Sequence, residues 1–102
     1  MKRVKNPSVA GTFYPATKEE LVSMIKSEIE KNGNKCNLNH IDVSNITDFS
    51  YLFASTKAAN TTYGLNLFNG DISNWDISNV SNMTNIFINC PLENNPPVWY
   101  NN

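Results

Sequence analysis

The residues of this chain that could do chemistry include one histidine with an acid and a hydroxyl close by. His40, Asp42 and Ser44 alternate along the chain and supply the three residue types of a hydrolytic triad. Alternate residues of an extended segment point in parallel directions, whereas a triad requires the base to touch the nucleophile. We therefore predict that the chain has no catalytic residues and is not an enzyme.

A metal site is also not expected. Asp71, Ser73 and Asp76 offer oxygen ligands, but they lack the glycine and the closing glutamate of a calcium-binding loop. Cys36 and Cys90 have neither C-x-x-C spacing nor histidine neighbours, which argues against zinc. We predict no cofactor and two free, buried or half-buried thiols, although cysteine pairing cannot be deduced from a sequence.

An internal repeat positions these residues. Shifting the chain by 34 residues aligns segment 41–53 with segment 75–87 and keeps every core position apolar. Four aligned pairs are identical: Asp42/Asp76, Ser44/Ser78, Asn45/Asn79 and Phe53/Phe87. The spacing L-x-x-L-x-L-x-x-L is typical of the strand half of a leucine-rich repeat, and a tight return turn follows it. We expect Val43 and Ile77 to lie in neighbouring parallel strands.

The repeat predicts an α/β fold, a short leucine-rich-repeat-like solenoid of about two repeats in one domain over residues 17–102. An extended arm, residues 1–16, precedes the domain. The domain is divided into a capping helix (17–33), repeat one (36–56), an insertion loop (57–67), repeat two (68–90) and a proline-rich C-terminal cap (91–102), in which Val98 and Trp99 cover the last turn. Two repeats are fewer than arrays usually need, so either the caps are essential or copies associate end to end.

The capping helix is predicted from its ends and its apolar stripe. Thr17 and Glu20 form a capping box, in which the Glu20 carboxylate reaches back to the Thr17 amide. Asn32-Gly33 supplies a left-handed stop. The apolar stripe consists of Leu21, Val22, Ile25 and Ile29. We expect this stripe to belong to the core, because an open-ended solenoid needs a lid.

Binding is the remaining use for the polar side chains. Solenoids bind through exposed sheet faces. The candidate surface, here called the polar face, consists of His40, Asp42, Ser44, Asn74, Asp76 and Ser78. Tyr51, Tyr63 and Tyr100 are candidate anchors, because tyrosine is enriched in binding hot spots. In the alternative interpretation the polar residues are solvated and stabilise turns through local hydrogen bonds.

Composition excludes some partners. The 102-residue chain has a formal net charge of −1, so an electrostatic case for nucleic acid is absent. No apolar run is long enough to span a bilayer. The basic start, residues 1–5, is not followed by the apolar region of a signal peptide. As written, the chain is expected in the cytoplasm, and its true location stays unknown.

Two segments of the chain resemble known protein families. Residues 68–87, FNGDISNWDISNVSNMTNIF, resemble the repeat of BspA-type leucine-rich-repeat surface proteins, also called the mycoplasma-lipoprotein-type repeat. That resemblance implies a bacterial surface protein that binds host or partner proteins and has no catalytic residues. Residues 7–21 have a weaker similarity to the Memo-like family, but the histidines of a metal site are missing, so no activity is inferred.

Two functions follow from these observations. The first is a non-catalytic protein–protein interaction module of the BspA-like type, with a protein partner of unknown identity. The alternative is a small intracellular inhibitor or regulator, encoded by a mobile element, that blocks an enzyme such as a defence nuclease. The missing export signal, in a chain that resembles exported proteins, motivates this alternative.

Overall fold

One α-helix and one 3₁₀ helix are the regular elements of the described chain. The computed structural model describes residues 14–55 and 63–100. In these ranges α1 spans Lys18–Asn32 and η2 spans Pro91–Glu93. No helix there has the length and hydrophobicity to cross a membrane. Most of the predicted arm and of the insertion loop lies outside the described residues.

Capping residues define both ends of α1. Thr17 Oγ1 accepts a hydrogen bond from the Glu20 N–H at 3.1 Å. Glu20 Oε1 accepts from the Ala16 N–H at 2.7 Å, one residue before the amide that we predicted. Gly33, with φ of 86°, ends the helix and donates to the Ile29 carbonyl. The predicted helix is therefore confirmed, and its buried apolar residues are Leu21, Val22 and Ile25.

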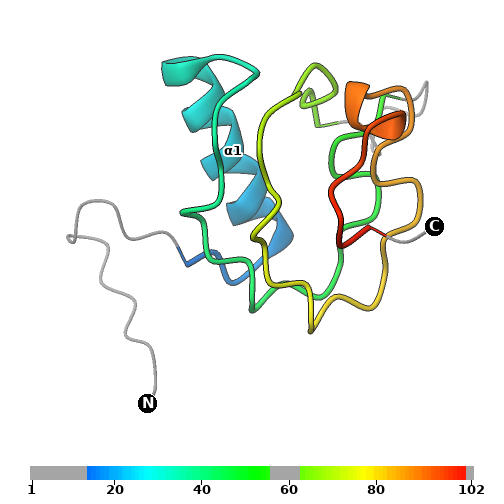
Figure 1. The fold of residues 1–102 in the computed structure, drawn as a ribbon. Helices are drawn as coiled ribbons and strands as arrows, with labels where there is room; N and C mark the ends of the chain where they lie inside the picture. Colours follow the sequence, from blue (N-terminus) through cyan, green and yellow to red (C-terminus); the bar gives the residue numbers. More distant parts are fainter. Residues whose placement is uncertain (1–13, 56–62, 101–102) are drawn as a thin grey trace.

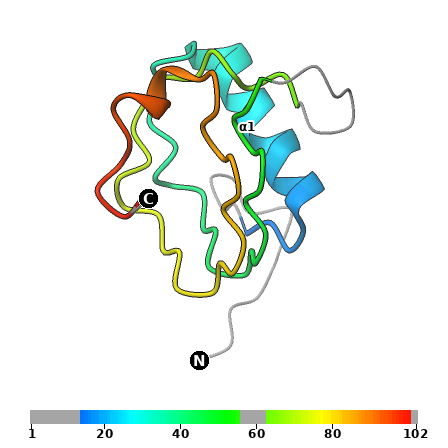
Figure 2. The ribbon, with the colours of Figure 1, turned by 90° about the vertical axis from the view of Figure 1, so that its right-hand side faces the viewer.

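Two segments without regular structure, coil 1 (residues 34–55) and coil 2 (residues 68–90), run side by side in parallel (Figures 1 and 2). The amides of residues 49, 51, 53 and 55 donate to the carbonyls of residues 82, 84, 86 and 88 at 2.7–3.0 Å. At the start of the coils, the Leu38 N–H donates to the Asp71 carbonyl at 2.9 Å. Gly70 lets the coils approach here, because a Cβ would collide with the Cys36 carbonyl.

The predicted α/β solenoid is wrong. Within residues 14–55 and 63–100 there is no strand, so there is neither a sheet nor a leucine-rich-repeat fold. The coils share only two isolated parallel bridges, Asn37 with Asp71 and Asp48 with Asn82. Val43 and Ile77 therefore do not lie in parallel strands.

Turns replace the strands. In coil 1 the N–H groups of residues 41, 46 and 52 donate to the carbonyls three residues earlier, at 2.9–3.1 Å. In coil 2 residues 75, 80 and 86 do the same at 3.0–3.2 Å. Each L-x-x-L spacing therefore closes a β-turn, with its first and last side chains directed to the core. A backbone that turns every five or six residues cannot sustain the ladder of a sheet.

The core contains a stack of aromatic rings. Phe53 stacks on Phe68 at 5.1 Å and on Phe87 at 5.8 Å between ring centroids. Trp75 is 4% exposed, and its indole N–H donates to the Leu38 carbonyl at 2.9 Å. The placement of Trp75 and Phe87 in the core is confirmed.

The C-terminal segment adds a further layer on the side away from α1 (Figures 1 and 2). Trp99 stacks on Trp75 at 6.4 Å, and its N–H donates to the Ile72 carbonyl at 2.7 Å. Since Ile72 is equivalent to Leu38 under the 34-residue shift, Trp99 repeats the contact that Trp75 makes. Trp99 caps coil 2 as predicted, but Val98 does not, because it is 90% exposed.

Truncation of Trp75 tests this packing. Trp75→Ala removes a buried ring and leaves the Leu38 carbonyl without its donor, so we expect a loss of about 3–5 kcal/mol in the free energy of unfolding. Chemical denaturation measures the loss. The control Val98→Ala should be close to neutral, because that side chain is exposed. A loss below about 1 kcal/mol for Trp75→Ala would contradict the packing.

Candidate functional site

The structure places the polar face at the junction of the two coils. His40, Asn74, Asp76 and Ser78 are exposed, whereas Asp42 and Ser44 are half-buried. The Asn74 N–H donates to Asn39 Oδ1 at 2.8 Å, and Asn79 Nδ2 donates to the Ser44 carbonyl at 2.7 Å. These bonds bring the two predicted sets of residues next to each other. Binding by the polar face itself stays a prediction.

Local hydrogen bonds use much of the polar face. Six aspartate or asparagine residues each accept, through Oδ1, the N–H two residues later at 2.8–3.0 Å. They form three equivalent pairs across the coils: Asn37/Asp71, Asp42/Asp76 and Asp48/Asn82. These Asx turns are the local hydrogen bonds of the alternative interpretation. Hydrogen bonds from Ser73 and Ser78 hold the pKa values of Asp71 and Asp76 below the ordinary value.

The geometry does not assemble a triad. The Ser44 hydroxyl donates to Asp42 Oδ1, while His40 Nε2 lies 3.5 Å from Glu28 Oε1 on α1. The base is therefore directed to the helix, and the hydroxyl is directed to the acid.

The thiols are not activated either. Burial, together with the nearby Glu28, raises the pKa of Cys36, and burial raises the pKa of Cys90. Both thiols are free. A raised pKa lowers the fraction of thiolate, which is the nucleophile and the metal ligand. No group of three or more metal-ligating side chains occurs in the described ranges.

The three tyrosines have different surroundings. Tyr51 is half-buried, and its hydroxyl accepts from Asn85 Nδ2 at 3.2 Å. Tyr63 is half-buried under Lys18, with the ammonium 5.2 Å from its ring centroid. Tyr100 packs edge-on against Phe87 at 5.1 Å. Of the three, only Tyr100 lines the groove described next.

Sequence reasoning missed a groove of about 330 Å³ beside coil 2, here called the edge groove. It is lined by Met83, Thr84, Asn85, Phe87, Ile88, Glu93 and Tyr100. Thr84, Asn85 and Glu93 are exposed polar residues, and Phe87 is buried. The apolar part of the lining, here called the apolar floor, consists of the half-buried Met83, Ile88 and Tyr100. The groove combines main chain from coil 2 with side chains that follow it in η2 and the C-terminal segment.

The backbone at the edge groove has unused donors. In coil 1, the amides of residues 49, 51 and 53 donate to coil 2. Their equivalents after the 34-residue shift are the amides of Met83, Asn85 and Phe87. Within the described residues, none of these three amides donates to an acceptor. The carbonyls of residues 82, 84 and 86 point to coil 1. In a trans peptide bond the N–H points opposite to the carbonyl before it, so the amides of residues 83, 85 and 87 point away from coil 1. We call this row the open edge.

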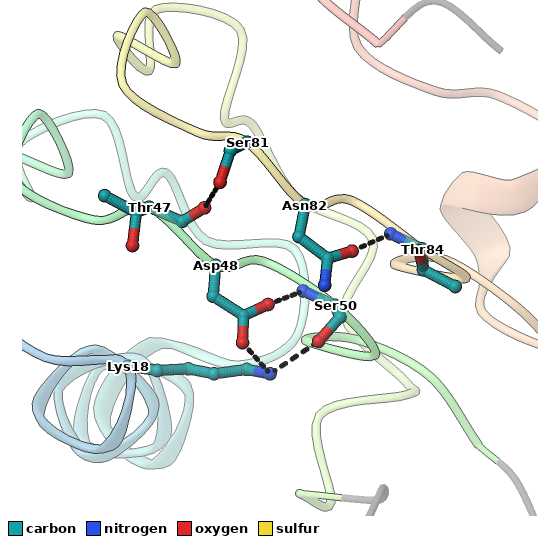
Figure 3. Close-up of polar contacts among 7 residues, drawn as sticks. All are labelled: Lys18, Thr47, Asp48, Ser50, Ser81, Asn82 and Thr84. Atoms are coloured by element: carbon teal, nitrogen blue, oxygen red, sulfur yellow. Dashed lines mark hydrogen bonds and ion pairs between the residues drawn. The ribbon is translucent and has the colours of Figure 1, made fainter.

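A lysine on α1 fixes coil 1 at one Asx turn (Figure 3). Lys18 Nζ lies 3.7 Å from Asp48 Oδ2 and donates to Ser50 Oγ at 3.1 Å. Burial disfavours the charged form of Asp48, but hydrogen bonds from Ser50 and the Lys18 charge outweigh it and lower the pKa below 3.8. The equivalent turn in coil 2 uses Asn82, so the turn itself does not require a charge.

The substitution Asp48→Asn removes the ion pair with Lys18 and keeps the Asx turn. The amide oxygen keeps the Asx bond, as at Asn82, so the loss at pH 7 should not exceed about 1 kcal/mol for this half-exposed pair. Because the folded-state pKa is lowered, Asp48 stabilises the fold above pH 3.8, and this contribution disappears as the pH falls through the folded-state pKa. Denaturation at several pH values should therefore show a smaller loss on acidification in Asp48→Asn than in the original chain. Identical pH profiles would contradict the coupling.

One protein family matches the chain, over residues 19–101. Its description is "Mycoplasma protein of unknown function, DUF285". The match includes nearly all of α1, both coils and the C-terminal cap. Of the segment that resembles the Memo-like family, it includes only residues 19–21. None of the curated proteins matches the chain, and none of the solved structures does. The chain therefore belongs to DUF285, a bacterial family of unknown function.

Proposed function

We propose that the chain is a non-catalytic protein-binding module of the BspA-like type and that it binds a partner protein through the edge groove. The observation that carries this proposal is the open edge, with three alternate amides beside an apolar floor. The BspA-like segment 68–87, which lies within the region that matches DUF285, supports it by resemblance. A role at the bacterial surface, which the resemblance implies, belongs to the same proposal.

An exposed backbone edge favours addition of another chain. Unpaired amides of this kind pair readily with an extended segment, which gains hydrogen bonds and places alternate side chains in a groove. A bound segment would also cover the half-buried apolar side chains of the groove, which adds a favourable contribution to binding. Met83, Ile88 and Tyr100 supply this surface.

The chemistry of the described residues favours binding over catalysis. The aspartates of the Asx turns accept hydrogen bonds from their own backbone, and both thiols have raised pKa values. The polar face is the second candidate surface in this proposal. It differs from the edge groove because its oxygens already stabilise turns.

A pair of matched substitutions distinguishes the two surfaces. Thr84→Arg places a bulky side chain in the edge groove, and Ser78→Arg places the same side chain on the polar face. Both original residues are exposed, so both variants should fold, which circular dichroism and denaturation check. The tagged chain is used to capture partners from the native cells. We expect Thr84→Arg to reduce capture of the same protein at least about tenfold, and Ser78→Arg to leave it unchanged.

Two results would contradict this assignment. If Ser78→Arg abolishes capture and Thr84→Arg does not, the polar face is the binding surface. If neither substitution reduces the capture of any protein that the original chain binds, the chain is not a binding module of this kind.

A further inference from the structure

We infer that the occupant of the edge groove is an extended, positively charged segment of the partner protein, which adds to the open edge as a further layer of backbone. This inference rests on the proposed function and specifies the mode of binding and the chemistry of the partner. Three features carry it: the spacing of the amides, the floor of the groove and the distribution of charge.

The spacing of the amides defines the backbone of the partner. Coil 1 uses the amides of residues 49, 51 and 53 to bind every second carbonyl of coil 2. The open edge repeats this spacing with Met83, Asn85 and Phe87. It therefore fits a backbone segment that presents acceptors at every second residue, over about five residues, and an extended segment is the simplest backbone with this spacing.

The kinked backbone of the open edge does not prevent this pairing. Asn85 has φ of 52°, and the equivalent residue of coil 1, Tyr51, has φ of 59°. The Tyr51 N–H nevertheless donates to the Thr84 carbonyl at 3.0 Å. Coil 1 thus demonstrates that this conformation presents its amides to a neighbouring chain.

The floor of the groove selects alternate apolar side chains. Phe87 is buried, while Met83, Ile88 and Tyr100 are half-buried. All four line the groove. In an extended segment every second side chain faces the same way, so the residues that face this floor are expected to be apolar.

The distribution of charge selects positive residues at the other positions. From residue 58 to residue 102 the sequence contains Asp71, Asp76 and Glu93 but no lysine, arginine or histidine. Glu93 lines the groove, and its Oε1 accepts from the Asn89 N–H at 3.1 Å, which holds the carboxylate at one end. A cationic segment complements this charge.

The same charges disfavour a second copy of this chain. Pairing two open edges would place two segments of net charge −3, each with its own Glu93, against each other. A basic segment of another protein meets no such repulsion.

Amide hydrogen exchange, measured by NMR on the isotopically labelled full chain, tests the inference. The probe is an acetylated nine-residue peptide that alternates lysine and valine, and the control peptide alternates glutamate and valine. We expect the lysine peptide at saturation to slow exchange of the Met83, Asn85 and Phe87 amides at least about tenfold. The equivalent amides of coil 1 should not change, because they are already hydrogen-bonded. The glutamate peptide should slow none of them.

Two charge variants test the role of Glu93. Glu93→Gln keeps an acceptor for the Asn89 N–H and removes the charge, so affinity for the lysine peptide should fall about threefold. The matched control Asp71→Asn removes one charge outside both the groove and the polar face. Its amide oxygen keeps the Asx turn, as in Asn37, and affinity should be unchanged.

Three outcomes would overturn the inference. Equal protection by both peptides would exclude selection for positive charge. Protection that depends on protein concentration without peptide would identify a second copy as the occupant. Absence of protection would exclude pairing at the open edge. If Thr84→Arg still abolishes capture of the native partner, the proposed function survives that last outcome, and only the mode of binding is wrong.

Discussion

The hydrogen bond from an Asx side-chain oxygen to the N–H two residues later is the interaction on which the path of both coils depends. It recurs at three equivalent positions in each coil, with distances of 2.8–3.0 Å. Each bond turns the backbone before a strand can form, and the following L-x-x-L spacing closes a β-turn. Apolar side chains are thereby directed to one side, where they form the core.

Hydrogen bonds between the two coils join them in parallel, in addition to the local bonds of the turns. Alternate amides of residues 49–55 make four of these bonds, and asparagine side chains add others. The indole groups of Trp75 and Trp99 then join successive layers through main-chain carbonyls. The tryptophans thus combine apolar packing with a directed hydrogen bond, which fixes the register of the layers.

The C-terminal segment covers coil 2 only in part. Trp99 and Tyr100 cover the aromatic core, where Trp99 contacts Trp75 and Tyr100 contacts Phe87. They do not reach the amides of Met83 and Asn85. The incomplete cap therefore protects the core and leaves a backbone edge beside an acidic residue. The proposed binding of a protein segment uses this combination.

The sequence by itself determined the 34-residue relation between the coils, the apolar core positions, and α1 with its caps. These features depend on local spacing and on side-chain types that the chain displays directly. It did not determine whether L-x-x-L segments form strands or turns, because both place the same residues in the core. Asp42 and Asp76 contained the signal for turns, but the repeat favoured strands.

Only the tertiary structure decided which surfaces remain available. The edge groove depends on which side of coil 2 meets coil 1 and on where Trp99 and Tyr100 pack, and no local pattern specifies either. The contact between Lys18 and Asp48 likewise joins residues 30 positions apart. Such contacts depend on how the whole core packs. Many side chains that are distant in the sequence contribute to the free energy of that packing, so no single segment predicts it.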